Sequence, residues 1–350
     1  MRDVHLWGRG GDPGPILRLM SGSWGLANTL RRKAYKKGFL NQEKAPVPLV
    51  SVGNLTVGGN AKTPMCVYLA KEFASRGLSP AVLSRGYGRE RSRLRPDPVV
   101  VSLGLGPLVP LEFAGDEPYL IARLSSAMVL VSAKRAPAAL EAADQGADVL
   151  ILDDGFQHLG LARDLDIVMI QGENGLGNGH VIPAGPLREP AGAIEDADML
   201  VYVGDGGPPD PVATLAQKKP LFTAKVVASG ISSLSDGETL PLDYLSGKRF
   251  AAFCGLARPQ GFRDTMANLG LAPVAFRAFP DHEPYGPREL RALDELLRFS
   301  RSEFLLTTLK DAVKLKGLRI PTFALETGLE PSDPVRLMDS VLGRLGISAK

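Results

Sequence analysis

The chain has 350 residues, of which 44% are hydrophobic and 23% charged, and its formal net charge is +3 at pH 7. This apolar content excludes a disordered chain, and the length favours two α/β domains of ordinary size. The small net charge gives no reason to expect a nucleic-acid partner. Two cysteines, Cys66 and Cys254, provide neither a disulfide framework nor a metal-ligand spacing. No apolar run is long enough to span a bilayer, so we expect a cytoplasmic chain.

Residues 1–45 are predicted to form a basic, amphipathic segment that associates with a membrane. A helix with aliphatic and Trp side chains beside Lys and Arg can lie in the interface of an anionic bilayer. A helix packed on its own domain, with solvated lysines, explains the pattern equally well, and RNA binding ranks third because only Tyr35 interrupts the basic block RRKAYKK. The apolar residues near helical spacing are Ile16, Leu19, Met20, Trp24 and Leu30.

A phosphate-binding loop is predicted between an apolar strand at residues 46–54 and a helix at residues 64–77. Oligophosphates require free backbone N–H groups, a helix N-terminus and a cation. We expect Lys62 to contact the β- and γ-phosphates of a nucleotide and Thr63 to bind Mg²⁺. The residues that would bind the nucleotide are Gly58, Gly59, Asn60, Ala61, Lys62 and Thr63.

This loop departs from the standard G-x-x-x-x-G-K-[ST] pattern at two positions. Thr56 stands at the first glycine and Ala61 at the second. Alanine adds a methyl group where the backbone must approach phosphate, although it is the smallest side chain that could be tolerated. A glycine-rich turn with an incidental Lys-Thr pair is the alternative interpretation.

Two aspartates follow a second apolar strand in the segment DVLILDDGFQH. Asp153 is predicted to bind Mg²⁺, because the metal must lie beside the β- and γ-phosphates at the C-terminal edge of the sheet. Asp154 is expected to hold a water molecule near the metal, or the substrate. A turn with an Asx hydrogen bond is the structural alternative.

Further acids and one histidine are candidates for proton transfer. Asp116 and Glu117 precede a helical pattern, where helix capping alone explains them. Alternatively, Asp116 accepts the proton of an attacking hydroxyl. His282 lies between Asp281 and Glu283, which would favour its protonated form, although a lone histidine is more often structural.

The order of the elements predicts the α/β class and a division into domains. Alternating strands and helices over residues 46–222 indicate a P-loop NTPase-like parallel sheet with the nucleotide at its C-terminal edge. Residues 223–247 have the alternation and turns of a β-hairpin linker. Residues 248–350 repeat the α/β pattern and are predicted to form a second, smaller α/β domain.

Eight segments, taken in order, resemble the bacterial tetraacyldisaccharide 4'-kinase family of the lipid A pathway. Three of them, SRGYGR, DDGFQH and PAGPLRE, are far more specific than a phosphate loop. The resemblance runs from about residue 47 to residue 314. The segments are VGNLTVGGNAKTP, LSRGYGR, GDEPYLIA, LDDGFQH, GNGHVIPAGPLRE, CGLARPQGF, FPDHEPY and TLKDAVK.

This resemblance implies an ATP- and Mg²⁺-dependent lipid kinase. The enzyme would transfer the γ-phosphate of ATP to the 4'-hydroxyl of an acylated glucosamine disaccharide 1-phosphate. It would be a peripheral protein at the cytoplasmic face of the bacterial inner membrane, with no protein partner or nucleic acid implied. Since a lipid substrate stays in the bilayer, the basic N-terminal helix would bring the site to the membrane.

The resemblance also implies roles for individual residues. It makes Asp116 and His282 a catalytic pair, places Lys62 and Thr63 on the nucleotide phosphates and Mg²⁺, and assigns Asp153 to the metal. Asp116 would accept the proton from the 4'-hydroxyl, and His282 would tune its charge and orientation.

Five further residues have implied roles around the transferred phosphate and the sugar. Arg135 would neutralise phosphate charge. Asp154 and Gln157 would shape the cleft toward the substrate, and Asn178 and Arg188 would contact the sugar or a phosphate. The loop that holds Asn178 and Arg188 could equally exist for its backbone turns.

Two departures from the family pattern leave alternative functions open. The family has glycine where Ala61 stands, and glutamate where Leu309 stands in TLKDAVK. One alternative is a membrane-surface nucleotide-binding switch without kinase activity, and another is a P-loop kinase acting on a soluble metabolite. Retention of Asp116, Asp153 and His282 argues against the switch, and the N-terminal segment argues against a soluble substrate.

Overall fold

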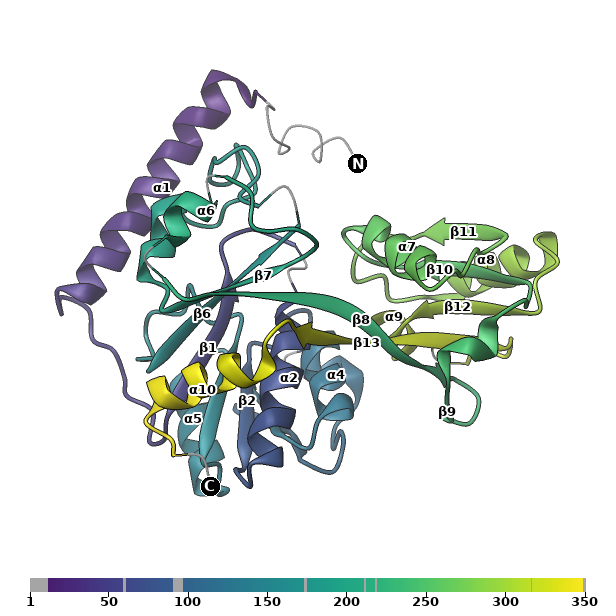
Figure 1. Ribbon diagram of the computed structural model, residues 1–350, viewed down its shortest axis with the longest axis horizontal. Coiled ribbons are helices and arrows are strands. Elements are labelled where there is room, and N and C mark those ends of the chain that lie inside the picture. Colours follow the sequence, from purple (N-terminus) through teal and green to yellow (C-terminus); the bar gives the residue numbers. More distant parts are fainter. Residues whose placement is uncertain are drawn as a thin grey trace.

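One curled, mixed β-sheet runs through the computed structural model from end to end (Figure 1). The structure describes residues 12–58, 61–90, 97–172, 175–210, 212–217, 219–315 and 317–348. Within them, 13 strands pair in the order β11-β10-β12-β13-β8-β7-β6-β1-β5-β2-β4-β3, and β9 pairs with β8 beside this path.

The sheet has a larger lobe, a smaller lobe and two strands that run between them. The strands of the larger lobe are β1 (Leu49–Asn54), β2 (Pro80–Ser84), β3 (Val99–Leu103), β4 (Met128–Val131), β5 (Val149–Asp153), β6 (Leu165–Gln171) and β7 (Met199–Val203). The linking strands are β8 (Leu221–Ser233) and β13 (Thr322–Pro331). The smaller lobe contains β9 (Thr239–Leu240), β10 (Phe250–Cys254), β11 (Ala275–Ala278) and β12 (Phe304–Thr308).

Helices cover both lobes. Those of the larger lobe are α1 (Gly14–Lys36), α2 (Lys62–Ser75), α3 (Leu111–Ala114), α4 (Asp116–Leu124), α5 (Arg135–Asp144), η1 (Ala191–Asp196), α6 (Val212–Ala216) and α10 (Pro334–Leu345). Those of the smaller lobe are η2 (Leu242–Leu245), α7 (Pro259–Asn268), α8 (Pro287–Phe299) and α9 (Leu309–Ala312).

The strand that precedes the phosphate loop lies in the middle of the larger lobe. β1 pairs in parallel with β5 on one side and β6 on the other, and β2 and β4 continue the parallel sheet beyond β5. Parallel strands end at the same edge of a sheet, so the segments after β1, β2, β4 and β5 meet there. This edge carries the candidate site.

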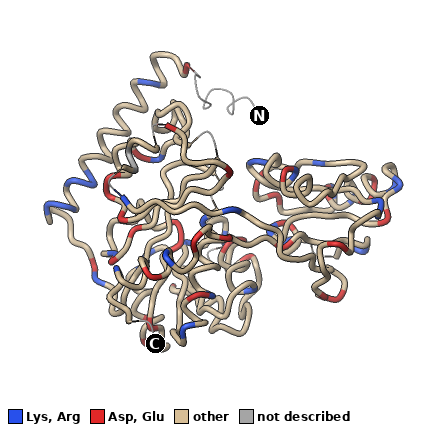
Figure 2. Tube along the Cα trace, in the orientation of Figure 1, with Lys and Arg blue, Asp and Glu red and all other residues tan. Residues whose placement is uncertain are grey.

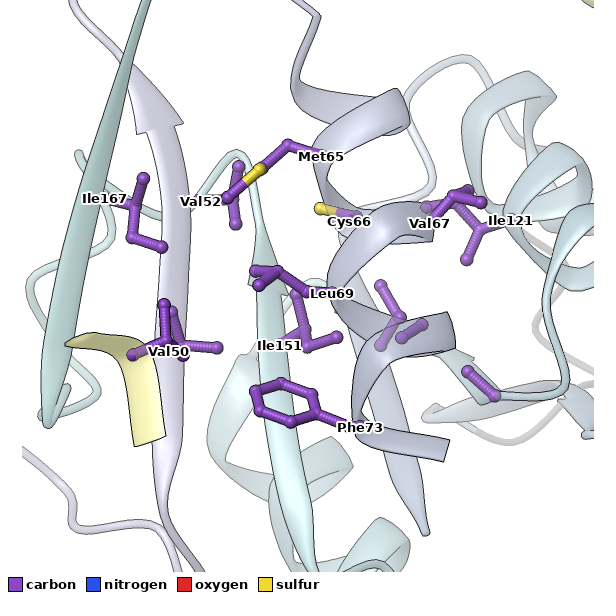
Figure 3. Packing of buried hydrophobic residues seen from close by; sticks show 14 of the residues in the cluster. Val50, Val52, Met65, Cys66, Val67, Leu69, Phe73, Ile121, Ile151 and Ile167 are labelled. Atoms are coloured by element: carbon purple, nitrogen blue, oxygen red, sulfur yellow. The ribbon is translucent and has the colours of Figure 1, made fainter. Parts of the chain in front are cut away.

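The helix that follows the phosphate loop packs its apolar side on the centre of this sheet. Met65, Leu69 and Phe73 project from α2 toward Val52 and Ile151, and all five are fully buried (Figure 3). The spacing of four residues between Met65, Leu69 and Phe73 places them on one side of α2. Each such side chain contributes about 1.5–3 kcal/mol by leaving water, so the start of α2 is held firmly at the sheet edge.

The two lobes are joined by a long antiparallel strand pair. β8 leaves the larger lobe and β13 returns to it, pairing from Phe323 with Ser233 to Pro331 with Ala224 (Figure 1). Within the expected linker at residues 223–247, β9 pairs antiparallel with the end of β8.

The expected smaller domain at residues 248–350 differs from the structure at its C-terminal end. Helix α10 packs with the core of the larger lobe, not with the smaller one. The helical spacing of its buried apolar residues suits packing on either lobe, so the sequence does not indicate which lobe they cover. They are Leu337, Met338, Val341, Leu342 and Leu345.

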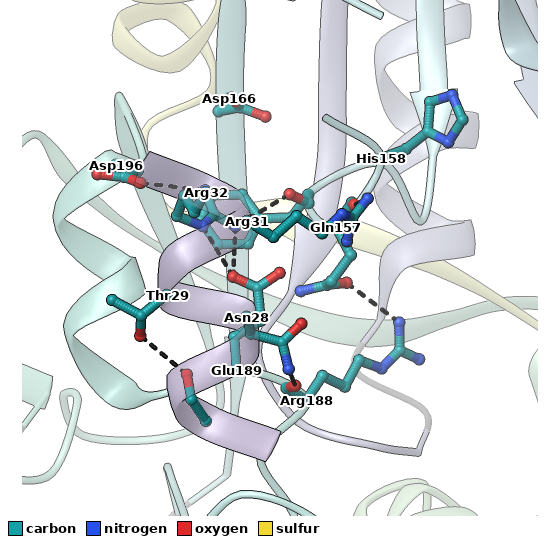
Figure 4. Close-up of polar contacts among 12 residues, drawn as sticks. Asn28, Thr29, Arg31, Arg32, Gln157, His158, Asp166, Arg188, Glu189 and Asp196 are labelled. Carbon is teal, nitrogen blue, oxygen red and sulfur yellow. Dashed lines mark hydrogen bonds and ion pairs between the residues drawn. The ribbon is translucent and has the colours of Figure 1, made fainter. Parts of the chain in front are cut away.

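Helix α1 packs on the larger lobe through small and polar side chains (Figure 4). Ser21 donates a hydrogen bond to the carbonyl of Val181 at 2.6 Å, and Gly25 lies against Val181 and Pro190. Arg32 is 8% exposed and pairs with Glu189 and with Asp196. Arg32, although part of the predicted basic block, is therefore buried in ion pairs with the larger lobe and is largely shielded from solvent.

The apolar side chains of α1 face away from the lobe. Leu19 is 77% exposed and Trp24 is 49% exposed. No helix within the described residues is long and apolar enough to cross a membrane. The helix is thus amphipathic, as predicted, with its polar side toward the protein. Its exposed large apolar residues are Ile16, Leu19, Met20, Trp24, Leu26 and Leu30.

The ion pair that docks α1 makes a testable contribution to stability. Arg32→Ala should lower the free energy of unfolding by about 3 kcal/mol, because Glu189 would be left buried without its cation. Chemical denaturation measures this difference. Lys33→Ala on the same helix is the matched control, and its exposed side chain should change stability by less than about 0.5 kcal/mol. Equal effects of the two substitutions would contradict the assignment.

Candidate active site

The phosphate loop connects the central strand β1 to α2. Gly58 has a φ of +103°, and Ala61 has the left-handed values φ 54° and ψ 23° immediately before α2 begins at Lys62. Gly59 and Asn60, also predicted to bind the nucleotide, lie outside the described residues. The position where the standard pattern has a second glycine thus has a backbone conformation that favours glycine.

Ala61 therefore stores backbone strain at the start of α2. A non-glycine residue in the left-handed region costs about 1–2 kcal/mol, part of which is offset because glycine loses more chain entropy on folding. Ala61→Gly should raise the free energy of unfolding by about 0.5–1 kcal/mol, measured by denaturant titration. The control Ala74→Gly, in the last turn of the same helix, should lower it by a similar amount. A loss of stability in both variants would show that Ala61 is not strained.

Lys62 is held in place by the ends of two neighbouring strands. Its ammonium is 3.1 Å from Asn54 Oδ1 and 3.2 Å from Asp154 Oδ1. Asp154 also accepts two hydrogen bonds from Arg188, at 2.7 and 2.8 Å. Burial opposes ionisation of Asp154, but Lys62 and Arg188 hold its pKa below the usual range. Two cations therefore converge on one carboxylate beside the phosphate loop.

Asp153, at the end of β5, is a buried carboxylate. Ser84 donates to its Oδ2 at 2.9 Å, and the Cys66 thiol lies 3.8 Å from its Oδ1. Burial, together with the charges of Glu117 and Asp154, raises the pKa of Asp153 to about 7. A cation beside it would reverse this preference and favour the ionised form.

These residues fit a Mg²⁺ ion that keeps water and phosphate among its ligands. Mg²⁺ prefers oxygen ligands and is commonly bound by one or two protein groups plus substrate phosphates. Asp153 offers a carboxylate, and Thr63, in the first turn of α2, offers a hydroxyl. No group of three or more His, Cys, Asp or Glu side chains suited to a metal occurs within the described ranges. The donor set is thus suited to Mg²⁺ held jointly with a nucleotide.

Asp116 and His282, which lie 166 residues apart, meet between the two lobes. His282 Nδ1 is 3.0 Å from Asp116 Oδ2, and Lys310 approaches the other ring nitrogen of His282 at 3.3 Å. Lys310 also bonds to Asp281 at 2.8 Å. Burial alone would raise the pKa of Asp116, but the hydrogen bond from His282 and the charge of Lys314 hold it below its usual value. Asp116 is therefore an ionised acceptor at neutral pH.

Two glycines allow the loop around Tyr87 to reach this pair. Gly86 has a φ of +63°, and a Cβ there would lie 2.9 Å from the carbonyl of Ala114. Gly115 has a φ of +85°, and a Cβ there would lie 2.9 Å from the carbonyl of Tyr87. This close approach places the Tyr87 ring 5.7 Å from the ring of His282.

Arg135 begins α5, at the same edge of the sheet. It is 4% exposed and donates to the carbonyl of Ser132 at 2.8 Å, while its Nε is buried without a hydrogen-bond partner. Burial lowers its pKa to about 10, which still leaves the guanidinium charged at pH 7. The group could therefore donate to an anion.

The remaining predicted residues are joined to one another or to their own loop. Gln157 donates to the carbonyl of Asn54 at 3.0 Å, and Arg188 lies 3.4 Å from Gln157 Oε1. Asn178 donates to the carbonyl of Ala184 and accepts from the N–H of His180. The roles of these side chains toward a substrate stay predictions.

Sequence reasoning missed several residues of this site. Asn54 and Ser84 each end a buried strand, a position that could have marked them. The sequence pattern assigns no role to Lys310, or to Lys314, which lies three residues after Asp311. Lys314 is buried and contacts Asp116 of the other lobe, which a single sequence does not show.

Comparisons with known proteins agree with this geometry. A family model described as LpxK: Tetraacyldisaccharide-1-P 4'-kinase matches residues 14–345. A protein from Geobacter sulfurreducens named tetraacyldisaccharide 4'-kinase is 40% identical over 337 residues, which cover 94% of each chain. The protein of the same name from Desulfatibacillum aliphaticivorans is 39% identical, covering 95% of this chain and 93% of its own. The chain belongs to the tetraacyldisaccharide 4'-kinase family.

A solved structure from this family confirms the predicted fold class. It is described as the "apo" form of LpxK from Aquifex aeolicus in complex with ATP. It matches with a TM-score of 0.75 and 34% identity, covering 93% of this chain and 97% of its own. As a member of the tetraacyldisaccharide 4'-kinase family, the chain is an ATP-dependent kinase.

Proposed function

We propose that this kinase transfers the γ-phosphate of ATP to the 4'-hydroxyl of tetraacyldisaccharide 1-phosphate, with Asp116 as the proton acceptor. The observation that carries this proposal is the contact between Asp116 and His282 across the two lobes, at the edge of the sheet where the phosphate loop begins. A protein that only binds nucleotide has no use for such an acceptor. The names of the relatives and the ATP in the Aquifex aeolicus structure support the choice of substrates.

The contacts of His282 support Asp116 as the group that takes the proton. An ammonium group can only donate, so Lys310 at Nε2 requires a neutral His282 to carry its proton on Nδ1. Nδ1–H then donates to Asp116 Oδ2, which leaves Oδ1 of the carboxylate to accept the proton of the sugar hydroxyl. His282 orients the acceptor and keeps it ionised. Phosphoryl transfer needs such a positioned acceptor more than a strong base.

The phosphate side of the reaction is assigned to residues around β1 and β5. Lys62 would contact the β- and γ-phosphates, and the buried Arg135 would stabilise charge on the transferred group. Thr63 and Asp153 would hold Mg²⁺, which when bound neutralises charge between the β- and γ-phosphates. Asp154 and Arg188 would face the substrate.

We further propose that α1 holds the enzyme on the cytoplasmic face of the inner membrane. Its exposed apolar side provides burial in the lipid interface, and its basic residues gather toward its C-terminal end (Figure 2). Arg32 and Lys36 pair with Asp196, so Lys33 and Lys37 remain for acidic lipid headgroups. A kinase that acts on a soluble substrate would not need an exposed apolar surface of this kind on α1.

A charge placed on the exposed side of α1 should release the protein from membranes. Leu19→Glu should reduce co-sedimentation with vesicles of 30% phosphatidylglycerol by about tenfold or more, because an apolar contact becomes an anion in the interface. Ser75→Glu, at the exposed end of α2 and away from α1, is the control for added charge. Equal binding by wild type and Leu19→Glu would contradict the membrane role.

The function is tested with γ-labelled ATP, Mg²⁺ and tetraacyldisaccharide 1-phosphate in detergent micelles. We expect label in the lipid and none in a 4'-deoxy analogue. ATP binding without transfer would favour the nucleotide-binding switch. Transfer to a soluble sugar, but not to the lipid, would favour a kinase of soluble metabolites.

A further inference from the structure

A buried lysine lies between the proton acceptor and the smaller lobe. The Lys314 side chain is 5% exposed, and its ammonium is 3.7 Å from Asp116 Oδ2 and 3.2 Å from Asp311 Oδ1. Neither contact has hydrogen-bond geometry, so the ammonium acts through its charge. Asp116 belongs to the larger lobe and Asp311 to the smaller one, so one cation is shared between carboxylates of both lobes.

Asp311 is anchored from the opposite side. It is fully buried, and its Oδ2 accepts hydrogen bonds from the N–H of Gly255 at 2.9 Å and the hydroxyl of Thr308 at 2.7 Å. The ring of Tyr285 lies 5.3 Å from the Lys314 ammonium. Lys314 therefore has a fixed position in the smaller lobe, and its charge has a fixed position relative to Asp116.

We propose that Lys314 is a positioning residue for phosphoryl transfer, which holds the Asp116 carboxylate ionised and ties it to the smaller lobe. The inference rests on the proposed role of Asp116 as the proton acceptor. A buried ammonium and two carboxylates are costly to remove from water, and an apolar pair would fill the same space with less penalty. The positive charge of Lys314 lies beside the proton acceptor Asp116, and we attribute its retention in a buried site to this role.

The groups that face Asp116 determine the expected pH dependence. His282, Lys310 and Lys314 approach it from the smaller lobe, and Glu117 follows it on α4. Burial raises the pKa of Asp116, while the hydrogen bond from His282 and the charge of Lys314 lower it. Removing the Lys314 charge should raise this pKa, so that Asp116 takes up a proton at a higher pH. The acidic limb of kcat/KM should then move to higher pH.

A purely structural role for Lys314 would give a different result. In that case the lysine would serve only to neutralise Asp311, and removal of both charges would leave the reaction of Asp116 unchanged. The double variant Lys314→Met/Asp311→Asn separates the two roles, because it leaves no uncompensated charge in the smaller lobe. Lys314→Arg keeps the positive charge and is the matched control.

The experiment measures kcat and kcat/KM for lipid labelling between pH 5 and 9, with ATP affinity and the thermal midpoint followed in parallel. The double variant should lose roughly 10- to 100-fold in kcat at pH 7, regain part of it at higher pH and bind ATP as wild type does. Lys314→Arg should retain the acidic limb of wild type. Should the double variant not fold, Lys314→Gln is judged by the same shift.

Two outcomes separate failure of this inference from failure of the proposed function. If wild type labels the lipid and the folded double variant, or Lys314→Gln in its place, has the same kcat and acidic limb, Lys314 is only structural and the inference is wrong. If wild type itself does not label the lipid, the proposed function fails first, before any variant is compared.

Discussion

Replacing Asp116 with asparagine should lower kcat for lipid phosphorylation by a factor on the order of 10²–10⁴, the usual contribution of a positioned proton acceptor. The amide keeps the size of the side chain and can still accept from His282 Nδ1 at the same distance. It cannot take the proton of the sugar hydroxyl. The reaction is measured with γ-labelled ATP, and ATP binding is measured by calorimetry.

Binding of ATP should remain close to that of wild type in this variant, because Asp116 lies on α4 and not in the phosphate loop. Asp144→Asn, at the exposed end of α5, removes a carboxylate of the same kind and is the control. A loss of less than about threefold in kcat for Asp116→Asn would show that the acceptor is another group. A matching loss of ATP affinity would mean that the substitution disturbs the nucleotide site instead.

Replacing Lys62 with methionine should lower kcat/KM for ATP by a factor on the order of 10²–10³, the cost of losing one preorganised charge at the transferring phosphate. Methionine has a similar length, so the buried space stays filled. Asp154 keeps its two hydrogen bonds from Arg188, so this carboxylate is not left without a cation. The effect should therefore appear in ATP affinity and transfer with little change in stability.

The matched control for this substitution lies on the same helix. Lys71→Met removes an exposed lysine of α2 and should leave kcat/KM within about twofold. Thermal shifts with and without Mg·ATP provide the second readout, since a ligand that binds only the folded protein raises its midpoint. A normal ATP-induced shift in Lys62→Met would contradict the assignment of Lys62 to the phosphates.

The larger part of the site could be predicted because it follows strand ends. Lys62 follows β1 across the predicted phosphate loop and Asp153 ends β5, and parallel strands bring such positions to one edge. The strand β1 and helix α2 were predicted from apolar runs and helical spacing, signals that need only neighbouring residues. The proximity of Asp116 and His282 came only from the family resemblance, because contacts over 166 residues leave no local pattern.

Other features could not be predicted because they depend on partners distant in the sequence. Arg32 belongs to a basic block that looks solvated, yet Glu189 and Asp196 bury it. In the sequence, Lys314 resembles any lysine near a helix end. Its contact with Asp116 of the other lobe is visible only in the structure. Helix α10 has an apolar periodicity that fits either lobe, and only the return of β13 decides which core it joins.

The course of β8 and β13 also determines the order in which the protein can fold during synthesis. The smaller lobe lies between these strands in the chain, and α10 follows both. A ribosome therefore completes the smaller lobe before it releases the helix that contributes Leu337, Met338 and Val341 to the larger core. Domains that emerge first generally fold first. The core of the larger lobe is complete only when α10 has been synthesised. We therefore expect the larger lobe, which carries the predicted nucleotide site, to complete its folding after the smaller lobe inserted within it.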